Sequence, residues 1–265
     1  MRRRAGRYTV AAVLAAALVA VPTARADTQV ASSGQVQATF SFVPGDYGQA
    51  TDFHLSVDRA GQRLYDQPLN VCCQPQGTKA VHVRDLDGDG EPEVWVDIWA
   101  GGAHCCTQME LLRFSGGTYR HQEQVFETGY TLKDLDGDGI PEFKTNDYRF
   151  AYAFTYFAAS PFPVRVLRYR TGTFAVVTKT FPKLVRKDRD RYRRLYRRGI
   201  RHHVPSLGAL AGWTADEYLL GHRRQADKRL TRELHAGHLY NDAGYVHGRR
   251  FIRALKHDLR AAGYA

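Results

Sequence analysis

A nonapeptide that occurs twice restricts the fold of this chain more than any other feature. The sequence reads DLDGDGEPE at 85–93 and DLDGDGIPE at 134–142, so eight of nine letters match and the copies start 49 residues apart. Alternating aspartates and glycines favour a tight loop, and hydrophobic runs flank both copies. Repetition of this kind predicts two copies of one structural unit.

The residues around the loops alternate between apolar and polar positions, which predicts β-strands. Predicted hairpins pair residues 53–57 with 62–65, 80–83 with 94–98, 109–114 with 118–121, 130–132 with 142–144, and 164–169 with 173–178. The hairpins that follow the two loops resemble each other, as LLRFSGGTYR at 111–120 and VLRYRTGTFA at 166–175. Each unit is therefore predicted to have four strands, over 80–121 and 130–179, with an insertion of six residues in the second.

Four strands in about 50 residues are typical of one blade of a β-propeller. The stretch before Phe181 has room for about three such units, whereas closed propellers usually have four or more blades. We therefore expect a mainly β N-terminal domain at 27–182, made of β-hairpin repeats in a partial-propeller or two-sheet arrangement.

After Phe181 the period of the apolar residues becomes that of helices. Helices are predicted over 184–200, near 206–211, from Thr214 to Gly237 and over 251–262. Thr214 and Glu217 have the spacing of a capping box, which predicts that a helix starts directly after Thr214. A small all-α region at 183–265 thus completes the expected fold.

The first 26 residues have the three parts of a secretory signal peptide. Four arginines within residues 2–7 precede an apolar run at 10–21, and the tripeptide ARA at 24–26 is a typical cleavage site. An uncleaved anchor is the alternative, although the run is too short for a bilayer of about 30 Å. The sequence predicts a mature chain that starts at Asp27, has no transmembrane segment, and is secreted, extracellular or associated with the cell wall.

Four cysteines occur as two adjacent pairs, Cys72-Cys73 and Cys105-Cys106. Outside the cytosol cysteines are generally oxidised, and bridges between the two pairs avoid a strained ring between neighbours. Each such bridge would close a loop of about 34 residues and stabilise the fold by ~4 kcal/mol in the chain-entropy model. A soft-metal site is the alternative, because His104 lies beside the second pair.

The aspartates of each loop stand at alternate positions, and the glycines between them let the backbone turn so that the carboxylates converge. A set of oxygen ligands suits a hard cation such as Ca²⁺. The predicted ligands are Asp85, Asp87, Asp89, the Glu91 carbonyl and Glu93 in the first loop, and Asp134, Asp136, Asp138, the Ile140 carbonyl and Glu142 in the second. Two structural Ca²⁺ ions are therefore expected, because a cation removes the repulsion among these carboxylates.

Two other interpretations of the loops stay open. An EF-hand has a bidentate Glu at loop position twelve and a helix on each side. The twelfth positions here are Val96 and Thr145, and the flanking residues alternate as strands do. Two Asp-Gly hairpin turns without metal are the simpler alternative, which the near-identity of the two copies disfavours.

The strand–DxDGDGxxE–strand unit at roughly 80–180 resembles the FG-GAP/VCBS repeats of secreted bacterial proteins and integrin-type propellers. The resemblance implies structural calcium loops on β-hairpins, with the ligand positions named above. The ninth loop position is usually Asp in that family and is Glu93 or Glu142 here. The GGAHCC stretch at 101–106 is also similar to uncharacterised secreted proteins of high-GC Gram-positive bacteria, and this resemblance implies no activity.

The sequence contains no G-x-S-x-G, H-E-x-x-H or phosphate-loop motif. Catalytic residues are therefore unknown, and an enzyme is not the expected class. A secreted hydrolase acting on cell-wall or extracellular polymers is the alternative. Its groups would come from the helical region: His202, His203, His222, His235, His238, His247 and His257, with Asp216, Glu217 or Asp242.

Charge is distributed unevenly along the chain. Residues 27–182 hold 13 Lys and Arg against 19 Asp and Glu, whereas residues 183–265 hold 20 against 8. The run RDRYRRLYRR at 189–198 predicts a basic helix with tyrosines between the arginines, which suits a polyanionic partner. The residues expected to contact it are Arg189, Arg191, Arg193, Arg194, Arg197 and Arg198.

The alternative for this helix is a solvated face, or docking on the acidic β-region. An anionic cell-wall or extracellular polymer is the expected partner, and anionic lipid and extracellular nucleic acid are the alternatives. These features predict a secreted calcium-binding β-repeat protein, with a non-catalytic role in binding or adhesion at the cell surface or wall.

Overall fold

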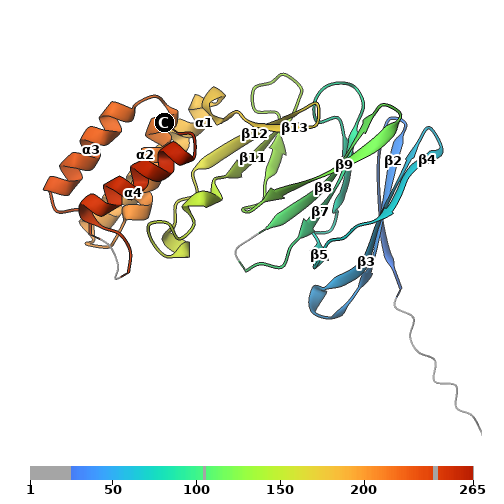
Figure 1. The fold of residues 1–265 in the computed structure, drawn as a ribbon, viewed down its shortest axis with the longest axis horizontal. Coiled ribbons are helices and arrows are strands. Elements are labelled where there is room, and N and C mark those ends of the chain that lie inside the picture. Colours follow the sequence, from blue (N-terminus) through green and yellow to red (C-terminus); the bar gives the residue numbers. More distant parts are fainter. Residues whose placement is uncertain (1–24, 104–105, 241–243, 265) are drawn as a thin grey trace, which may run out of the picture.

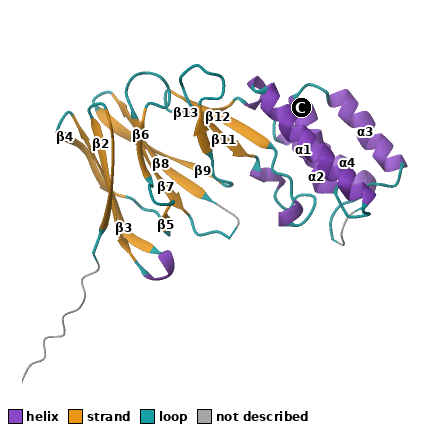
Figure 2. Ribbon diagram, turned by 180° about the vertical axis from the view of Figure 1, so that it is seen from behind, coloured by secondary structure: helices purple, strands orange, loops and turns teal. Residues whose placement is uncertain are grey.

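The protein was analysed as a computed structural model that describes residues 25–103, 106–240 and 244–264. Three antiparallel sheets form the N-terminal two-thirds, and four helices follow (Figures 1 and 2). This arrangement confirms the predicted mainly β region followed by an all-α region. The predicted signal peptide falls almost wholly on residues 1–24, outside the described residues. Among the described helices, none combines the length and the apolar character that crossing a bilayer requires.

The three sheets follow one another along the chain. Sheet A contains β1 (Asp27–Ser33), β2 (Val36–Pro44), β3 (Ala50–Arg59) and β4 (Gln62–Pro68), in that order. Sheet B contains β5 (Gln74–Pro75) and β6 (Val81–Arg84), which both pair with β7 (Glu93–Trp99), then β8 (Thr107–Ser115) and β9 (Thr118–Phe126). Sheet C contains β10 (Thr131–Lys133), β11 (Glu142–Asn146), β12 (Val164–Arg170) and β13 (Thr173–Val176), in that order.

Sheet B is the middle layer, because its strand β7 is buried on both faces. Val94, Val96 and Ile98 belong to a core shared with sheet A. Trp95 belongs to a second core, which includes Phe143 of sheet C. Successive side chains of a strand point to opposite faces, so this one strand joins the two cores. The sheets therefore stack as three layers in a row (Figure 1), one more than the two-sheet arrangement considered from sequence.

Sheets B and C pair their strands in the same register. Val94 lies opposite Leu112 across β7 and β8, and Phe143 lies opposite Leu167 across β11 and β12. These are equivalent positions of the two predicted units, at offsets of 49 and 55 residues. The acidic loops consequently occupy the same place in both sheets, between β6 and β7 and between β10 and β11.

The longer connection of sheet C joins the sheets to the helices. The segment 147–163 links β11 to β12 and includes the predicted insertion. Its Phe150 and Phe154 belong to the core of the helical region. The predicted domain boundary at 182/183 stays a prediction, since the helical core includes these two residues from before it.

The helices are α1 (Pro182–Arg201), α2 (Leu207–Leu219), α3 (Arg223–His235) and α4 (Gly248–Ala261). The predicted capping box is wrong, because Thr214 lies fully buried within α2 and its hydroxyl donates to the Leu210 carbonyl at 2.8 Å. Leu207 and Leu210 are buried in the helical core, so burial of apolar residues starts this helix well before Thr214. Gly221, at φ +78°, follows the end of α2 and separates it from α3.

Candidate metal sites and a basic surface

Each acidic loop is closed by the same backbone hydrogen bonds. In loop 1 (residues 85–93), Asp85 accepts from the amides three and five residues later, at 2.6 and 3.0 Å. In loop 2 (residues 134–142), Asp134 accepts the equivalent bonds at 2.7 and 2.9 Å. The glycines at 88, 90, 137 and 139 have φ between +79° and +89°, which is the region that favours glycine. The shared sequence therefore produces the same local fold twice.

Each loop gathers three carboxylates that could hold a metal ion. The first triad is Asp85, Asp87 and Glu93, and the second is Asp134, Asp136 and Glu142. Within each triad one oxygen from every residue lies within 4.8 Å of the others. Calcium binds oxygen at 2.3–2.6 Å, so oxygens on opposite sides of one ion lie up to about 5 Å apart. The triads therefore have the dimensions of a cation site.

The glutamate that ends each loop is the most buried member of its triad. Glu93 and Glu142 are 1% and 0% exposed. Each accepts a hydrogen bond at 2.9 Å from the backbone amide of the second loop residue. Burial, together with the charges of the loop aspartates, raises the pKa of Glu93 to about 8. A bound cation would reverse this effect, because it stabilises the charged carboxylate.

An arginine from the neighbouring strand lies against each triad. Arg113 of β8 has its Nη2 at 3.0 Å from Asp89, and Arg168 of β12 pairs with Asp136 and Glu142. These ion pairs were not expected from sequence. The signal for them was present, since both arginines are the third letter of the similar segments LLRFSGGTYR and VLRYRTGTFA. Without metal, one guanidinium offsets part of the negative charge of each set of carboxylates.

Loop 1 also contacts both neighbouring sheets. Arg59 at the end of β3 forms two hydrogen bonds to the Glu91 carboxylate, at 3.0 and 2.6 Å. The Thr171 amide, in the turn between β12 and β13, donates to Asp87 Oδ2 at 2.8 Å. Gly88 lies directly against the Ile140 side chain of loop 2, since a Cβ at Gly88 would be 2.6 Å from Ile140 Cδ1. The two loops therefore lie side by side where the sheets meet.

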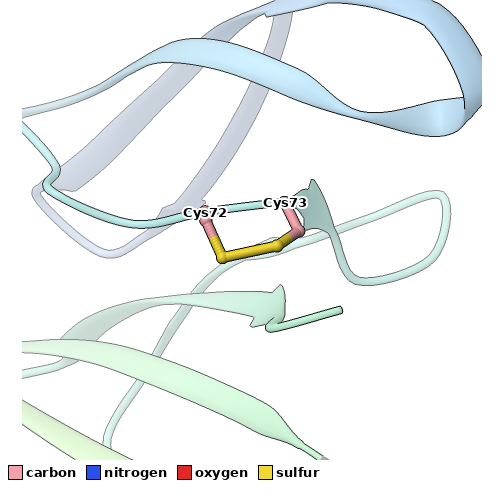
Figure 3. The surroundings of a disulfide bond; sticks show 2 residues. All are labelled: Cys72 and Cys73. Atoms are coloured by element: carbon pink, nitrogen blue, oxygen red, sulfur yellow. A yellow bond between two sulfur atoms is a disulfide. The ribbon is translucent and has the colours of Figure 1, made fainter. Parts of the chain in front are cut away.

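The cysteines pair differently from the sequence-based expectation. Cys72 is bonded to Cys73 (Figure 3), and Cys106 is also in a disulfide. Cys73 has φ +114°, a conformation that non-glycine residues rarely adopt. The two segments are nevertheless adjacent, because Cys73 Sγ lies 2.9 Å from the position of a Cβ at Gly101. Cys105 and His104 lie outside the described residues.

The basic helix α1 divides into two parts. Arg189, Arg191 and Arg193 each form an ion pair with an acidic residue of the helical region, of which the Arg191–Asp188 pair is the shortest at 2.7 Å. Tyr192 is buried, and its hydroxyl accepts a hydrogen bond from the Phe162 amide at 2.7 Å. The first part of the helix is therefore engaged in internal contacts.

The second part of α1 carries exposed arginines. Arg194, Arg197 and Arg198 have no ion pair among the described residues. With Arg201 and Arg229 they line a cavity of about 630 Å³. Tyr196, Glu233 and His238 are also in its wall. The six arginines expected to contact a polyanion are thus split into three paired and three free residues.

The groups considered for a hydrolase are spread over the helical region. His222 lies 2.7 Å from Glu217, and His238 lies 2.7 Å from Glu233. Asp216 is completely buried, and neither of its carboxylate oxygens has a hydrogen-bond partner among the described residues. Burial raises the pKa of Asp216 well above its usual value. Asp242 lies outside the described residues, and the described histidines are not gathered into one site.

Comparison with known proteins gives two distant relatives. The chain is 24% identical over 209 residues to a protein of Synechocystis sp. named probable thylakoid lumen protein, covering 72% of this chain and 62% of the relative. It is 30% identical over 115 residues to an uncharacterised protein of Sinorhizobium fredii, covering 42% of this chain and 18% of that protein. The chain therefore spans less than two-thirds of either relative. No protein-family model matches it.

Proposed function

We propose that each acidic loop binds one Ca²⁺ ion, and that the two ions stabilise the stack of sheets. The observation that carries this proposal is the duplication of a triad of carboxylates with the same geometry in loops 1 and 2. The remaining ligands would be Asp89 and the Glu91 carbonyl in loop 1, and Asp138 and the Ile140 carbonyl in loop 2. Oxygen ligands favour calcium over softer metals, and the resemblance to FG-GAP/VCBS repeats points to the same ion.

The alternative to a metal site is a loop whose carboxylates are paired with an arginine, Arg113 in loop 1 and Arg168 in loop 2. In that alternative each guanidinium stays paired with its loop, and the loops are acidic turns closed by ion pairs. In loop 1 the ninth-position glutamate supports the metal instead, because Glu93 is almost completely buried and Arg113 Nε approaches it only to 3.8 Å. Glu142 of loop 2 is paired directly with Arg168, so this argument applies to loop 1 alone. Burying a carboxylate of this kind is costly unless it is paired or bound to a cation.

Calcium titration of the chain from Asp27 onward tests the proposal, since this part holds every described helix and strand. Calorimetry with Ca²⁺ should report two sites, and thermal unfolding should occur at higher temperature in Ca²⁺ than in chelator. Asp87→Asn and Asp136→Asn should each remove one site, and Asp46→Asn, an exposed residue outside both loops, should remove none. Absence of both heat and a thermal shift would leave the arginine-closed turn as the explanation.

The second proposed role is binding of an anionic polymer by the exposed part of α1. Arg194, Arg197 and Arg198 are the residues that support it, because they line a cavity with two further arginines and lack ion pairs among the described residues. Arginine suits phosphate and carboxylate groups, since its planar group forms two parallel hydrogen bonds to them. The role would be non-catalytic, in binding or adhesion.

Binding to teichoic acid and to polyglutamate tests this role. The triple variant Arg194→Ala, Arg197→Ala and Arg198→Ala should lose most of the affinity and much of its dependence on salt concentration. A matched control is Arg249→Ala, Arg250→Ala and Arg253→Ala, which removes three exposed charges from α4. Equal loss in both triple variants would show that net charge alone, and not this surface, attracts the polymer.

Export from the cytosol is proposed on three grounds. The relative from Synechocystis is named as a probable protein of the thylakoid lumen, and disulfides persist mainly in oxidising compartments, as the Cys72–Cys73 bond would require. The arginine-rich and apolar sequence of residues 2–21 supports a signal peptide. Mass spectrometry of the exported protein should find an N-terminus at Asp27, and an N-terminus at Met1 would contradict cleavage.

A further inference from the structure

A cavity of about 500 Å³ lies between β1, β6 and β10, one strand from each of the three sheets. Its wall includes Ser32 of β1, His82 of β6 and Leu132 of β10, together with Asp97 of β7. Cavities of about 300–1,000 Å³ are typical of sites for small ligands. This cavity is separate from the acidic loops, since no residue of either loop belongs to its wall.

A connected set of polar and aromatic groups forms one side of the cavity. Trp95 Nε1 donates to the Tyr130 hydroxyl at 2.9 Å, and this hydroxyl donates to Asp97 Oδ2 at 2.7 Å. His82 stacks on Trp95 with ring centroids 4.8 Å apart, and its Nε2 lies 3.4 Å from Asp97 Oδ2. Asp97 is 7% exposed, so Tyr130 and His82 hold a nearly buried carboxylate in place. Groups fixed in this way are pre-organised for a ligand.

Two basic side chains at the cavity are available to bind an anion. Lys79 and Arg84 belong to the wall and are exposed. Neither forms an ion pair among the described residues, although residues 27–182 contain more acidic than basic side chains. In an acidic region, two unpaired cations beside one cavity mark a local site for negative charge.

The equivalent residues of the second unit differ, so the repeated hairpin does not by itself require this set, although Trp95 also packs in the core between sheets B and C. His82, Trp95 and Asp97 correspond to Thr131, Lys144 and Asn146 in the second unit, at the offset of 49 residues. The loop aspartates and glycines are kept at this same offset. A constellation that only one of two equivalent sheets carries is therefore better explained by a specific role than by the requirements of the sheet.

We propose that this cavity binds an anionic sugar, meaning a sugar ring that carries a carboxylate or a phosphate. Lys79 and Arg84 pair with the negative group. Asp97 accepts hydrogen bonds from ring hydroxyls, and the exposed face of His82 packs against the apolar face of the ring. Binding is reversible and needs no metal, so it is independent of the calcium sites.

Calorimetric titration of the chain from Asp27 onward, in saturating Ca²⁺, tests the proposal with four probes. These are glucuronate, glucose 6-phosphate, glucose and inorganic phosphate, each up to about 10 mM, so that binding as weak as millimolar is detected. We expect glucuronate or glucose 6-phosphate to bind at least tenfold more tightly than glucose and than phosphate. The carboxylate and phosphate probes also distinguish the two sources of negative charge.

Variants locate the binding. Lys79→Ala with Arg84→Ala should weaken binding at least tenfold, and both residues are exposed, so the fold should be kept. Lys183→Ala with Arg186→Ala removes two exposed charges from α1 and should leave binding unchanged. Asp97→Asn should also weaken binding, with far-ultraviolet circular dichroism as the check of folding. Any of three results overturns the proposal: no probe binds, glucose or phosphate binds as tightly as the anionic sugars, or the Lys79/Arg84 variant binds normally.

Discussion

Loops 1 and 2 share their sequence and their internal hydrogen bonds, but their surroundings differ. In loop 1 the Asp87 side chain is 2% exposed, whereas its counterpart in loop 2, Asp136, is 40% exposed. Loop 1 contacts sheet A through Glu91 and sheet C through Asp87. The nonapeptide therefore determines the shape of the loop, whereas the position of the loop in the stack determines how many other segments it contacts.

The largest expected difference between the loops concerns removal of a metal ligand. In Ca²⁺ at about 100 times its dissociation constant, loss of one site costs about 2.7 kcal/mol of stability. Asp136→Asn should show this cost, and Asp87→Asn should cost about 1 kcal/mol more, because it also weakens the hydrogen bond from the Thr171 amide. Urea unfolding of both variants in Ca²⁺ and in chelator measures the costs. Equal costs of the two variants in Ca²⁺ would show that the burial of Asp87 adds nothing to the stability that the bound ion provides.

Substitutions at Gly88 and Gly137 test, without metal, whether the surroundings constrain loop 1 more than loop 2. Both have positive φ, +79° and +85°, so an alanine costs about 1–2 kcal/mol of backbone strain at either position. At Gly88 the new Cβ would also meet Ile140, while at Gly137 no atom lies within 4 Å. Gly88→Ala should therefore cost about 1–3 kcal/mol more than Gly137→Ala, measured by urea unfolding in chelator. Similar losses of stability in the two variants would show that the Ile140 side chain moves aside at little cost.

Much of this fold could be predicted from the sequence, because its strands are short and joined by recognisable turns. The predicted hairpins at 53–65, 80–98, 109–121 and 164–178 correspond to pairs of strands in the structure. The acidic triads could also be predicted, since alternate positions in a tight glycine-rich loop converge for local reasons. Sheet A was not predicted as a four-stranded unit, because it lacks the acidic loop that is repeated in sheets B and C.

The features that were not predicted from the sequence depend on contacts between distant segments. Arg113 reaches loop 1 from the neighbouring strand, and only the register of β7 against β8 brings it there. Thr214 and Glu217 have the spacing of a capping box. The helix nevertheless begins before Thr214, because Leu207 and Leu210 are buried in the helical core. Local rules determine loops and turns well, whereas burial decides where a helix begins and which charges meet.

The arginines allow a third comparison, which concerns affinity for calcium. Arg168 pairs closely with two carboxylates of loop 2, while Arg113 approaches loop 1 at 3.0 Å or more. Because a guanidinium and a cation compete for the same oxygens, Arg168→Gln should raise the calcium affinity of loop 2 about tenfold, or ~1.4 kcal/mol. Arg113→Gln should raise that of loop 1 only a few-fold. Calorimetry on each variant checks this, and unchanged affinities would mean that the arginines move away when the ion binds.

The smallest expected effect belongs to a contact that only loop 1 has. Arg59 holds the Glu91 carboxylate with two hydrogen bonds, and both side chains are less than one-third exposed. The corresponding residue of loop 2 is Ile140, which packs on Gly88 and cannot form such a pair. A double-mutant cycle with Arg59→Gln and Glu91→Gln should give a coupling of about 1 kcal/mol. The more exposed pair of Arg63 and Asp58, both within sheet A, is the control and should give less. If the two couplings are equal, the contact between sheet A and loop 1 contributes no more than a surface ion pair, and the dependence of the stack on loop 1 must come from the side of sheet C.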